Sequence, residues 1–460
     1  MTPAVRSVTP PSGPPSSAVT SPTSGHSPAL RSGRARSGAG PRGRCPTARA
    51  LAGDPPPGPA APVPTPAGVA PLPQGDAPPV ADSLLRCAEG PAGEYEWPAR
   101  PGPARLDDPG DLIAAIPAML GFHPERSLVL AVLCDVPGTP LSAVIDLVVR
   151  FDLWQPATGH PADDAMVAAA AARVCARPGV AGVLLVLVDD GLEDPEVSVP
   201  QYIPVLEHLE RLLAPAAVPV RGAWAAHTIA AGNPWWSLTD PDRCGRIADP
   251  AASRVTLSRV LDGRPVRHSR AELTALITAD TALCAEVSAE LGAAKDRAKD
   301  RYAAAAGRSD PIGFLRGELV TVLWLIVSAE SGAELAAREL ADIAVALRDR
   351  ELRDCMFALA ATPHAATAEQ LWVRLTCALR GADRAETATL LGYFAYVRGD
   401  GPFAGIALDA ALEADPQHSM ATLLHTALEA GMRPERLRDL ARCGRDCAAG
   451  FGVDLDAEQW

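Results

Sequence analysis

The sequence predicts a mixed α/β protein in which a β-sheet flanked by helices is followed by an all-helical C-terminal region. Between residues 105 and 250, β-rich apolar runs alternate with helix-like segments, which indicates a sheet covered on both faces. After about residue 250 only amphipathic helical patterns remain. With 48% hydrophobic residues in 460, the chain can bury a sizeable core.

The chain begins with a segment that we expect to be a disordered extension, residues 1–104. It holds 24 of the 46 prolines and almost no periodic apolar pattern, so it cannot offset the entropy lost on ordering. Residues 1–53 contain seven arginines and no acidic residue. This basic arm is either a solvated arm or a weak nucleic-acid contact.

The α/β domain is assigned to residues 105–250. Asp108 favours a helix start and Gly121 a helix end, so a short helix precedes the first strand. Residues 127–134 and 141–151 form neighbouring antiparallel strands. In the rest of the domain helices and strands alternate. We expect a helix over 161–177, a strand over 183–188, a helix over 202–213 and a strand over 218–227.

The helical region is assigned to residues 251–433, and residues 434–460 to a C-terminal tail. Its first helices are expected over residues 252–261, 270–291, 313–328 and 333–348. Further on, residues 385–397 and 403–414, joined by the turn Arg398–Gly401, resemble one tetratricopeptide-like helix pair. That pairing is typical of binding and interaction proteins.

Composition and charge point to a cytoplasmic protein. The start of the chain lacks the apolar run of a signal peptide, and the ten scattered cysteines indicate reduced thiols. The apolar run 319–329 is too short to cross a bilayer and is predicted to be a buried helix, so no membrane segment is expected. Beyond residue 53 acidic residues exceed basic ones by 20, which argues against nucleic-acid binding by the folded part.

Several common catalytic signatures are missing. A Walker A loop needs Gly-Lys-Ser/Thr, but Lys295 and Lys299 each stand between Ala and Asp. There is no Gly-x-Gly-x-x-Gly, His-Glu-x-x-His or Gly-x-Ser-x-Gly motif. No cofactor is therefore identified by motif.

The first candidate site is the pair Asp189 and Asp190, directly after an apolar strand. Open α/β sheets place ligands outside the carboxyl ends of their strands. Two carboxylates there can hold a divalent metal such as Mg²⁺, or serve as catalytic acid and base. The alternative is a polar strand exit with an Asp-Gly turn at Asp190–Gly191.

The second candidate site involves two histidines and two tryptophans. His123, in Gly-Phe-His-Pro-Glu, can form a catalytic proton-transfer pair with Glu125, although a simple turn also explains this segment. His227 ends a predicted strand at the same mouth of the sheet. Trp235 and Trp236 follow it, and because neighbours on a strand face opposite ways, at most one of them binds a ligand.

Three stretches together resemble the actinobacterial family known as domain of unknown function 4192. They are DLIAAIPAMLGFHPERSLVLAVL (111–133), NPWWSL (233–238) and LLGYFAYVRGDGPFAGIALDAALEADPQHSMATLL (390–424). The resemblance spans residues 107–433 and implies a shared fold but no established activity. Relatives often carry a cysteine-rich stretch after the Trp pair. Here only Cys244 stands there, so the resemblance does not extend to a metal or redox role.

Two functions from different classes follow. The first is a non-enzymatic cytoplasmic binding or interaction protein that takes a protein partner through its helical C-terminal region. The alternative is an enzyme or sensor that acts on a small polar or phosphorylated metabolite at the mouth of the sheet. Its catalytic residues would be Asp189, Asp190, His123 and His227.

Overall fold

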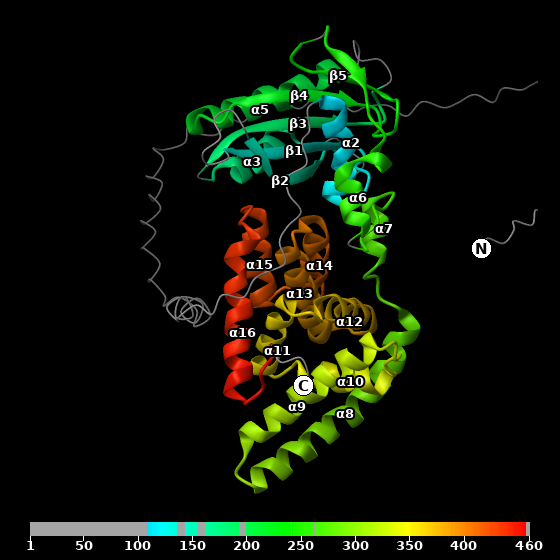
Figure 1. The fold of residues 1–460 in the computed structure, drawn as a ribbon, viewed down its shortest axis with the longest axis vertical. Helices are drawn as coiled ribbons and strands as arrows, with labels where there is room; N and C mark the ends of the chain where they lie inside the picture. Colours follow the sequence, from blue (N-terminus) through cyan, green and yellow to red (C-terminus); the bar gives the residue numbers. More distant parts are fainter. Residues whose placement is uncertain are drawn as a thin grey trace, which may run out of the picture. The chain divides into compact units, whose positions relative to one another are not determined.

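The computed structural model describes residues 108–135, 143–154, 162–177, 179–192, 199–240, 242–261 and 263–456. It shows a mixed six-stranded sheet with flanking helices, followed by an all-helical C-terminal region (Figure 1). The prediction for residues 1–104 lies outside the described residues.

The sheet has the strand order β2-β1-β3-β4-β5-β6. Its strands are β1 (Ser127–Asp135), β2 (Ala143–Asp152), β3 (Val180–Val188), β4 (Val220–Ala226), β5 (Pro234–Ser237) and β6 (Cys244–Arg246). Only β3 and β4 pair in parallel; every other neighbouring pair is antiparallel. The predicted pair of strands after the first helix is the β1–β2 pair, and β3 and β4 begin within three residues of their expected positions. The short strands β5 and β6 were not assigned from the sequence.

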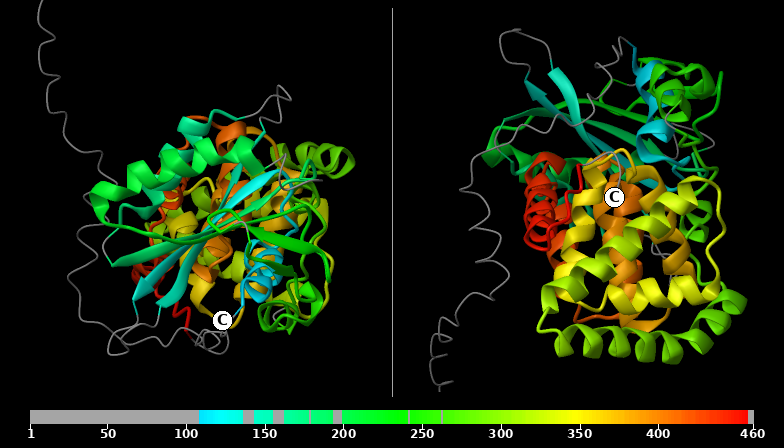
Figure 2. Two further views of the ribbon diagram at one scale, coloured as in Figure 1. Left: turned by 90° about the horizontal axis from the view of Figure 1, so that it is seen from above. Right: turned by 60° about the horizontal axis from the view of Figure 1, so that its bottom comes forward.

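The first face of the sheet is covered by α3 (Asp164–Cys175) and α5 (Ile203–Leu213), which lie across it in Figure 2. Short 3₁₀ turns, η2 (Val199–Tyr202) and η3 (Ala214–Ala216), flank α5. The apolar residues of α3 and α5 pack with alternate residues of β1 and β3, among them Leu128, Leu130 and Leu185. This cluster forms one of two cores.

The second core lies on the opposite face and continues into the helical region. It includes α2 (Pro109–Leu120), which begins at the N-cap Asp108 and ends at Gly121 in the left-handed conformation, as predicted. Buried residues from α2, the sheet and the later helices belong to one contiguous cluster, so the α/β and helical regions share a hydrophobic core.

After the sheet, the described residues of the helical region contain no further strand. After η4 (Pro250–Ala252), its elements are α6 (Arg254–Leu261), α7 (Arg270–Ala275), α8 (Thr281–Gly307), α9 (Pro311–Glu330), α10 (Ala337–Ala346), α11 (Arg350–Met356), η5 (Phe357–Ala361), α12 (Ala365–Ala378), α13 (Gly381–Arg398), α14 (Gly401–Ala414) and α15 (Ser419–Glu429). The segment assigned to a tail contains η6 (Pro434–Leu437) and α16 (Arg438–Gly450), which packs on α11.

Two expectations about these helices were wrong. The single helix over residues 270–291 is interrupted, because the Asp280 carboxylate caps a new helix at Ala282 and Leu283. The apolar run in α9 is buried on one face only, and Trp324 on the other face is 61% exposed. Within the described residues α9 is the one helix long and apolar enough to span a membrane, with 33% of that window buried.

An ion-pair cluster joins the sheet to the C-terminal end of the chain. Asp146 of β2 lies 3.3 Å from Arg177 and 3.3 Å from Arg433. Arg177 also donates a hydrogen bond to the carbonyl oxygen of Gly431. Because Asp146 and Arg177 are largely buried, Asp146 has a structural role that spans the two regions.

Candidate functional site

Asp189 lies where β3 ends, and its carboxylate is fully occupied by local partners. It is 3% exposed and accepts hydrogen bonds from the Gly191 backbone N–H (2.8 Å) and from the Tyr202 hydroxyl. Burial and the neighbouring Asp189 raise the pKa of Tyr202, so the phenol stays protonated and donates. These contacts are those of an Asp-Gly strand exit.

Asp190, the next residue, points to a different partner. Its half-exposed carboxylate forms a bidentate pair with Arg126, at 2.7 and 3.1 Å. The hydrogen bond from Arg126 holds the pKa of Asp190 below its ordinary value. Each aspartate thus has a partner of its own, while the two carboxyl groups still interact with each other, and no cluster of three potential metal ligands occurs in the described ranges.

The two histidines are both near the end of the sheet where β4 finishes. His227 directly follows β4, and its buried Nδ1 atom has no hydrogen-bond partner among the described residues. Burial lowers the pKa of His123, while a hydrogen bond to the Ile229 backbone acts in the opposite direction. His123 is thus near the segment that follows His227, with a ring that stays neutral at neutral pH.

The two tryptophans face opposite sides of the sheet, as strand alternation predicts. Trp235 is 4% exposed in the core shared with α2, whereas the half-buried Trp236 packs with the core under α3 and α5. A Cβ atom at Gly245 would lie 2.7 Å from the Trp235 ring, so the indole rests directly on that glycine. Trp235 is therefore a core residue.

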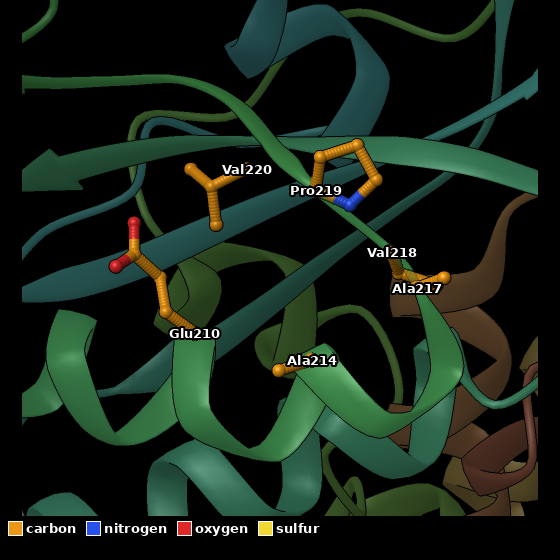
Figure 3. A pocket seen from close by; sticks show the side chains of 6 residues that line it. All are labelled: Glu210, Ala214, Ala217, Val218, Pro219 and Val220. Atoms are coloured by element: carbon orange, nitrogen blue, oxygen red, sulfur yellow. The ribbon is translucent and has the colours of Figure 1, made fainter.

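One pocket, of about 390 Å³, lies between α5 and the start of β4 (Figure 3). Among its lining residues only Glu210 is charged; the others are Ala214, Ala217, Val218, Pro219 and Val220. A ligand site needs several convergent polar groups to orient its ligand. This pocket lacks them.

A second pocket, of about 240 Å³, differs from the first because several charged residues line it. We call it the arginine pocket. It is formed by the end of α6, the segment that leads to α7, and parts of α12, α13 and α14. Its charged lining consists of Arg259, Arg264, Arg267, Arg398, Glu369 and Asp400. Four guanidinium groups thus face two carboxylates.

Asp400 holds two of these arginines in place. It is 3% exposed and caps the N-terminus of α14 through the Phe403 backbone N–H. Its Oδ2 atom accepts hydrogen bonds from Arg259 Nη2 at 2.9 Å and from Arg398 Nη2 at 3.3 Å. Asp400 therefore links Arg259 and Arg398, and Glu369 is a second carboxylate paired with Arg398.

The guanidinium groups keep buried donors that have no acceptor. Arg398 uses Nη1 for Glu369 (2.9 Å) and Nη2 for Asp400, but its Nε–H has no partner among the described residues. The Nε–H of Arg259 is likewise buried and unpartnered. An unsatisfied buried donor costs about 1–3 kcal/mol, so these two shielded N–H groups lower the stability of the pocket wall.

Burial raises the pKa of Glu369, and the adjacent Arg398 opposes this effect. The pocket therefore becomes more positive as the pH falls toward the raised pKa. Glu369 is the titratable carboxyl whose charge competes with an anion for Arg398.

Arg267 is positioned by the backbone of the α2–β1 connection. Its N–H donates to the Gly121 carbonyl (2.8 Å), and its own carbonyl accepts from the His123 N–H (3.1 Å). The half-buried guanidinium of Arg267 makes no hydrogen bond or ion pair within the described residues. It is the arginine with most capacity to bind a ligand.

Gly121 leaves room for the side chain of Arg259. A Cβ atom at Gly121 would lie 2.4 Å from Arg259 Nη2, and the glycine has a φ of 85°. Both the space and the left-handed backbone therefore require glycine. The end of α2 is in this way part of the wall behind the arginine pocket.

Sequence reasoning missed this pocket. It identified Arg398–Gly401 as a turn between helices, and the structure confirms the turn, with Gly399 ending α13 and Asp400 capping α14. The available signal was the set of three arginines at 259, 264 and 267 in a chain with few lysines. Their partner, Asp400, is 141 residues from Arg259 and could not be paired with it from the sequence.

The fold and the pocket define a mixed α/β protein with a helical C-terminal region and an arginine-lined cavity within it. The family profile described as Domain of unknown function (DUF4192) matches residues 109–435. This match covers most of the chain, and the protein belongs to that family. No curated protein and no solved structure matches it significantly.

Proposed function

We propose that this protein is a non-enzymatic binding protein whose ligand is a small anion held in the arginine pocket. The observation that carries this proposal is the convergence of Arg259, Arg264, Arg267 and Arg398 on one cavity. Only Glu369 and Asp400 oppose them in the described lining.

The chemistry of the arginines favours carboxylate and phosphate groups. Guanidinium groups bind both through paired, charge-assisted hydrogen bonds, and these are stronger where water is excluded. The guanidinium of Arg267 supplies such donors, and Arg259 and Arg398 line the same cavity beside it. Asp400 and Glu369 hold the donors in position rather than neutralise them all.

The test is thermal unfolding of the full chain with sulfate, phosphate and small carboxylates. A ligand at 100 times its Kd adds about 2.7 kcal/mol of stability, so at least one anion should raise the Tm by several degrees. Arg267→Ala should abolish most of this rise. Arg338→Ala, an exposed arginine on α10, is the matched control and should leave it unchanged.

Absence of any anion-dependent shift in the unchanged chain would refute the proposal. An equal loss in Arg267→Ala and Arg338→Ala would also refute it, because the effect would then come from general charge screening.

The alternative function is an enzyme or sensor for a small polar or phosphorylated metabolite at the edge of the sheet. The unpartnered Nδ1 of His227 and the neutral ring of His123 favour it. Turnover of phosphate esters that is lost in His227→Gln but kept in Arg267→Ala would support this alternative. The reverse result would favour the arginine pocket.

Partner binding and a cytoplasmic location are also proposals. The eight described cysteines are all free thiols, which supports a reducing compartment. Exposed apolar side chains on α9 support a protein partner for the helical region: Val320, Trp324 and Val327.

A further inference from the structure

The arginine pocket also has an apolar lining. Leu273 of α7 and Phe403 of α14 are each 5% exposed, and Val373 of α12 is half-buried beside them. Leu276, at the end of α7, is 36% exposed. The pocket therefore combines guanidinium donors with side chains that gain from contact with an apolar group.

An inorganic anion satisfies only part of this lining. Sulfate or phosphate can accept hydrogen bonds from the arginines, but it leaves Leu276 and Val373 in contact with water. A ligand that carries an apolar group next to its charge removes both kinds of surface from water. Sites of this mixed kind, mostly apolar with a few polar anchors, are typical of small-molecule pockets.

We infer that the ligand is an amphiphilic anion, in which a carboxylate or phosphate monoester is attached to a short aliphatic or aromatic group. This inference rests on the anion site proposed above. The anionic group contacts Arg267, with Arg259 and Arg398 beside it in the lining, and the apolar group contacts Val373 and Leu276. A cavity of roughly 150 Å³ holds benzene, so the pocket of about 240 Å³ has space for both groups.

The experiment is calorimetric titration of the full chain with two matched ligand series. Acetate, butyrate and hexanoate form the carboxylate arm, and phosphate, methyl phosphate and phenyl phosphate form the phosphate arm. Affinity should rise roughly three- to fourfold for each added methylene until the apolar space is filled. The arm with the higher affinity identifies the anionic group, and hexanol is the uncharged control.

Two kinds of variant separate the roles of the lining. Val373→Thr and Leu276→Asn should flatten the rise of affinity with chain length while sulfate binding is kept. Both changes are at positions with partial exposure, so the fold should tolerate them. Arg267→Ala should weaken every anion of both series by a similar factor.

The outcomes distinguish this inference from the proposed function. Sulfate binding together with a flat carboxylate and phosphate series would overturn the amphiphilic ligand and keep the anion site. No anion binding at all would overturn both. Hexanol binding as tightly as hexanoate would show that the pocket selects apolar groups without an anion.

Discussion

Charged side chains lie together both at the edge of the sheet and in the arginine pocket, but they are paired differently in the two places. At the sheet edge Asp189 is satisfied by Tyr202 and Gly191, and Asp190 by Arg126. In the arginine pocket two guanidinium groups share one carboxylate and keep buried donors without acceptors. The paired charges at the sheet edge hold the local side chains in place, whereas the guanidinium of Arg267 in the cavity is available to a ligand.

The largest effect predicted from this comparison of the two sites is the loss of stability when Asp400 is removed. Asp400→Ala leaves Arg259 and Arg398 buried without their shared carboxylate, and breaking a buried pair in this way costs about 3–5 kcal/mol. Urea unfolding should show this loss. Addition of sulfate should restore part of the stability, because an anion can replace the missing carboxylate.

The matched control is Asp409→Ala, on the same helix but exposed, where the pairs with Arg270 and His425 are on the surface. Its unfolding midpoint should change little. If the two variants lose the same stability, the arginines of the pocket do not depend on Asp400.

The second prediction concerns the sheet edge. Asp189→Ala should destabilise the protein by about 1–3 kcal/mol, because the Tyr202 hydroxyl and the Gly191 N–H lose their buried acceptor. Asp190→Ala, which removes only a solvent-exposed pair, should change the denaturation midpoint far less. Equal effects from the two aspartates would mean that the edge is not organised around Asp189.

The smallest predicted effect is a pH dependence. Because burial raises the pKa of Glu369, protonation removes a negative charge from the arginine pocket as the pH falls. Sulfate keeps its charge, so its affinity should increase as the pH falls through the raised pKa of Glu369. In titrations with Glu369→Gln the increase should disappear; if it persists undiminished, another group is responsible.

Much of the fold could be predicted because its signals are local. Asp108 and Gly121 cap the two ends of α2. Trp235 and Trp236 are neighbours on β5, so their side chains lie on opposite faces of the sheet. The boundary between α7 and α8 was not predicted, because it depends partly on a contact with a residue far away in the sequence. There the Asp280 backbone N–H donates to the carbonyl of Cys377, a residue of α12.

The candidate site was less predictable than the fold. Adjacent aspartates after a strand suggest a shared metal, but only the positions of Tyr202 and Arg126 reveal that each carboxylate already has its own partner. The arginine pocket has no compact motif, since Gly121, Arg267 and Asp400 come from three separate parts of the chain. Such a site becomes visible only when tertiary contacts are known.

The long separation between Arg259 and Asp400 also has a consequence during protein synthesis. The two residues are 141 positions apart, so at 5–20 residues per second the ribosome adds Asp400 roughly 7–28 s after Arg259. Until then the α2–β1 connection and Arg267 can already be in place, but the wall formed by α13 and α14 is missing. The pocket is therefore completed only after α13 and α14 have been synthesised, and a ligand can recognise the chain only from that stage on.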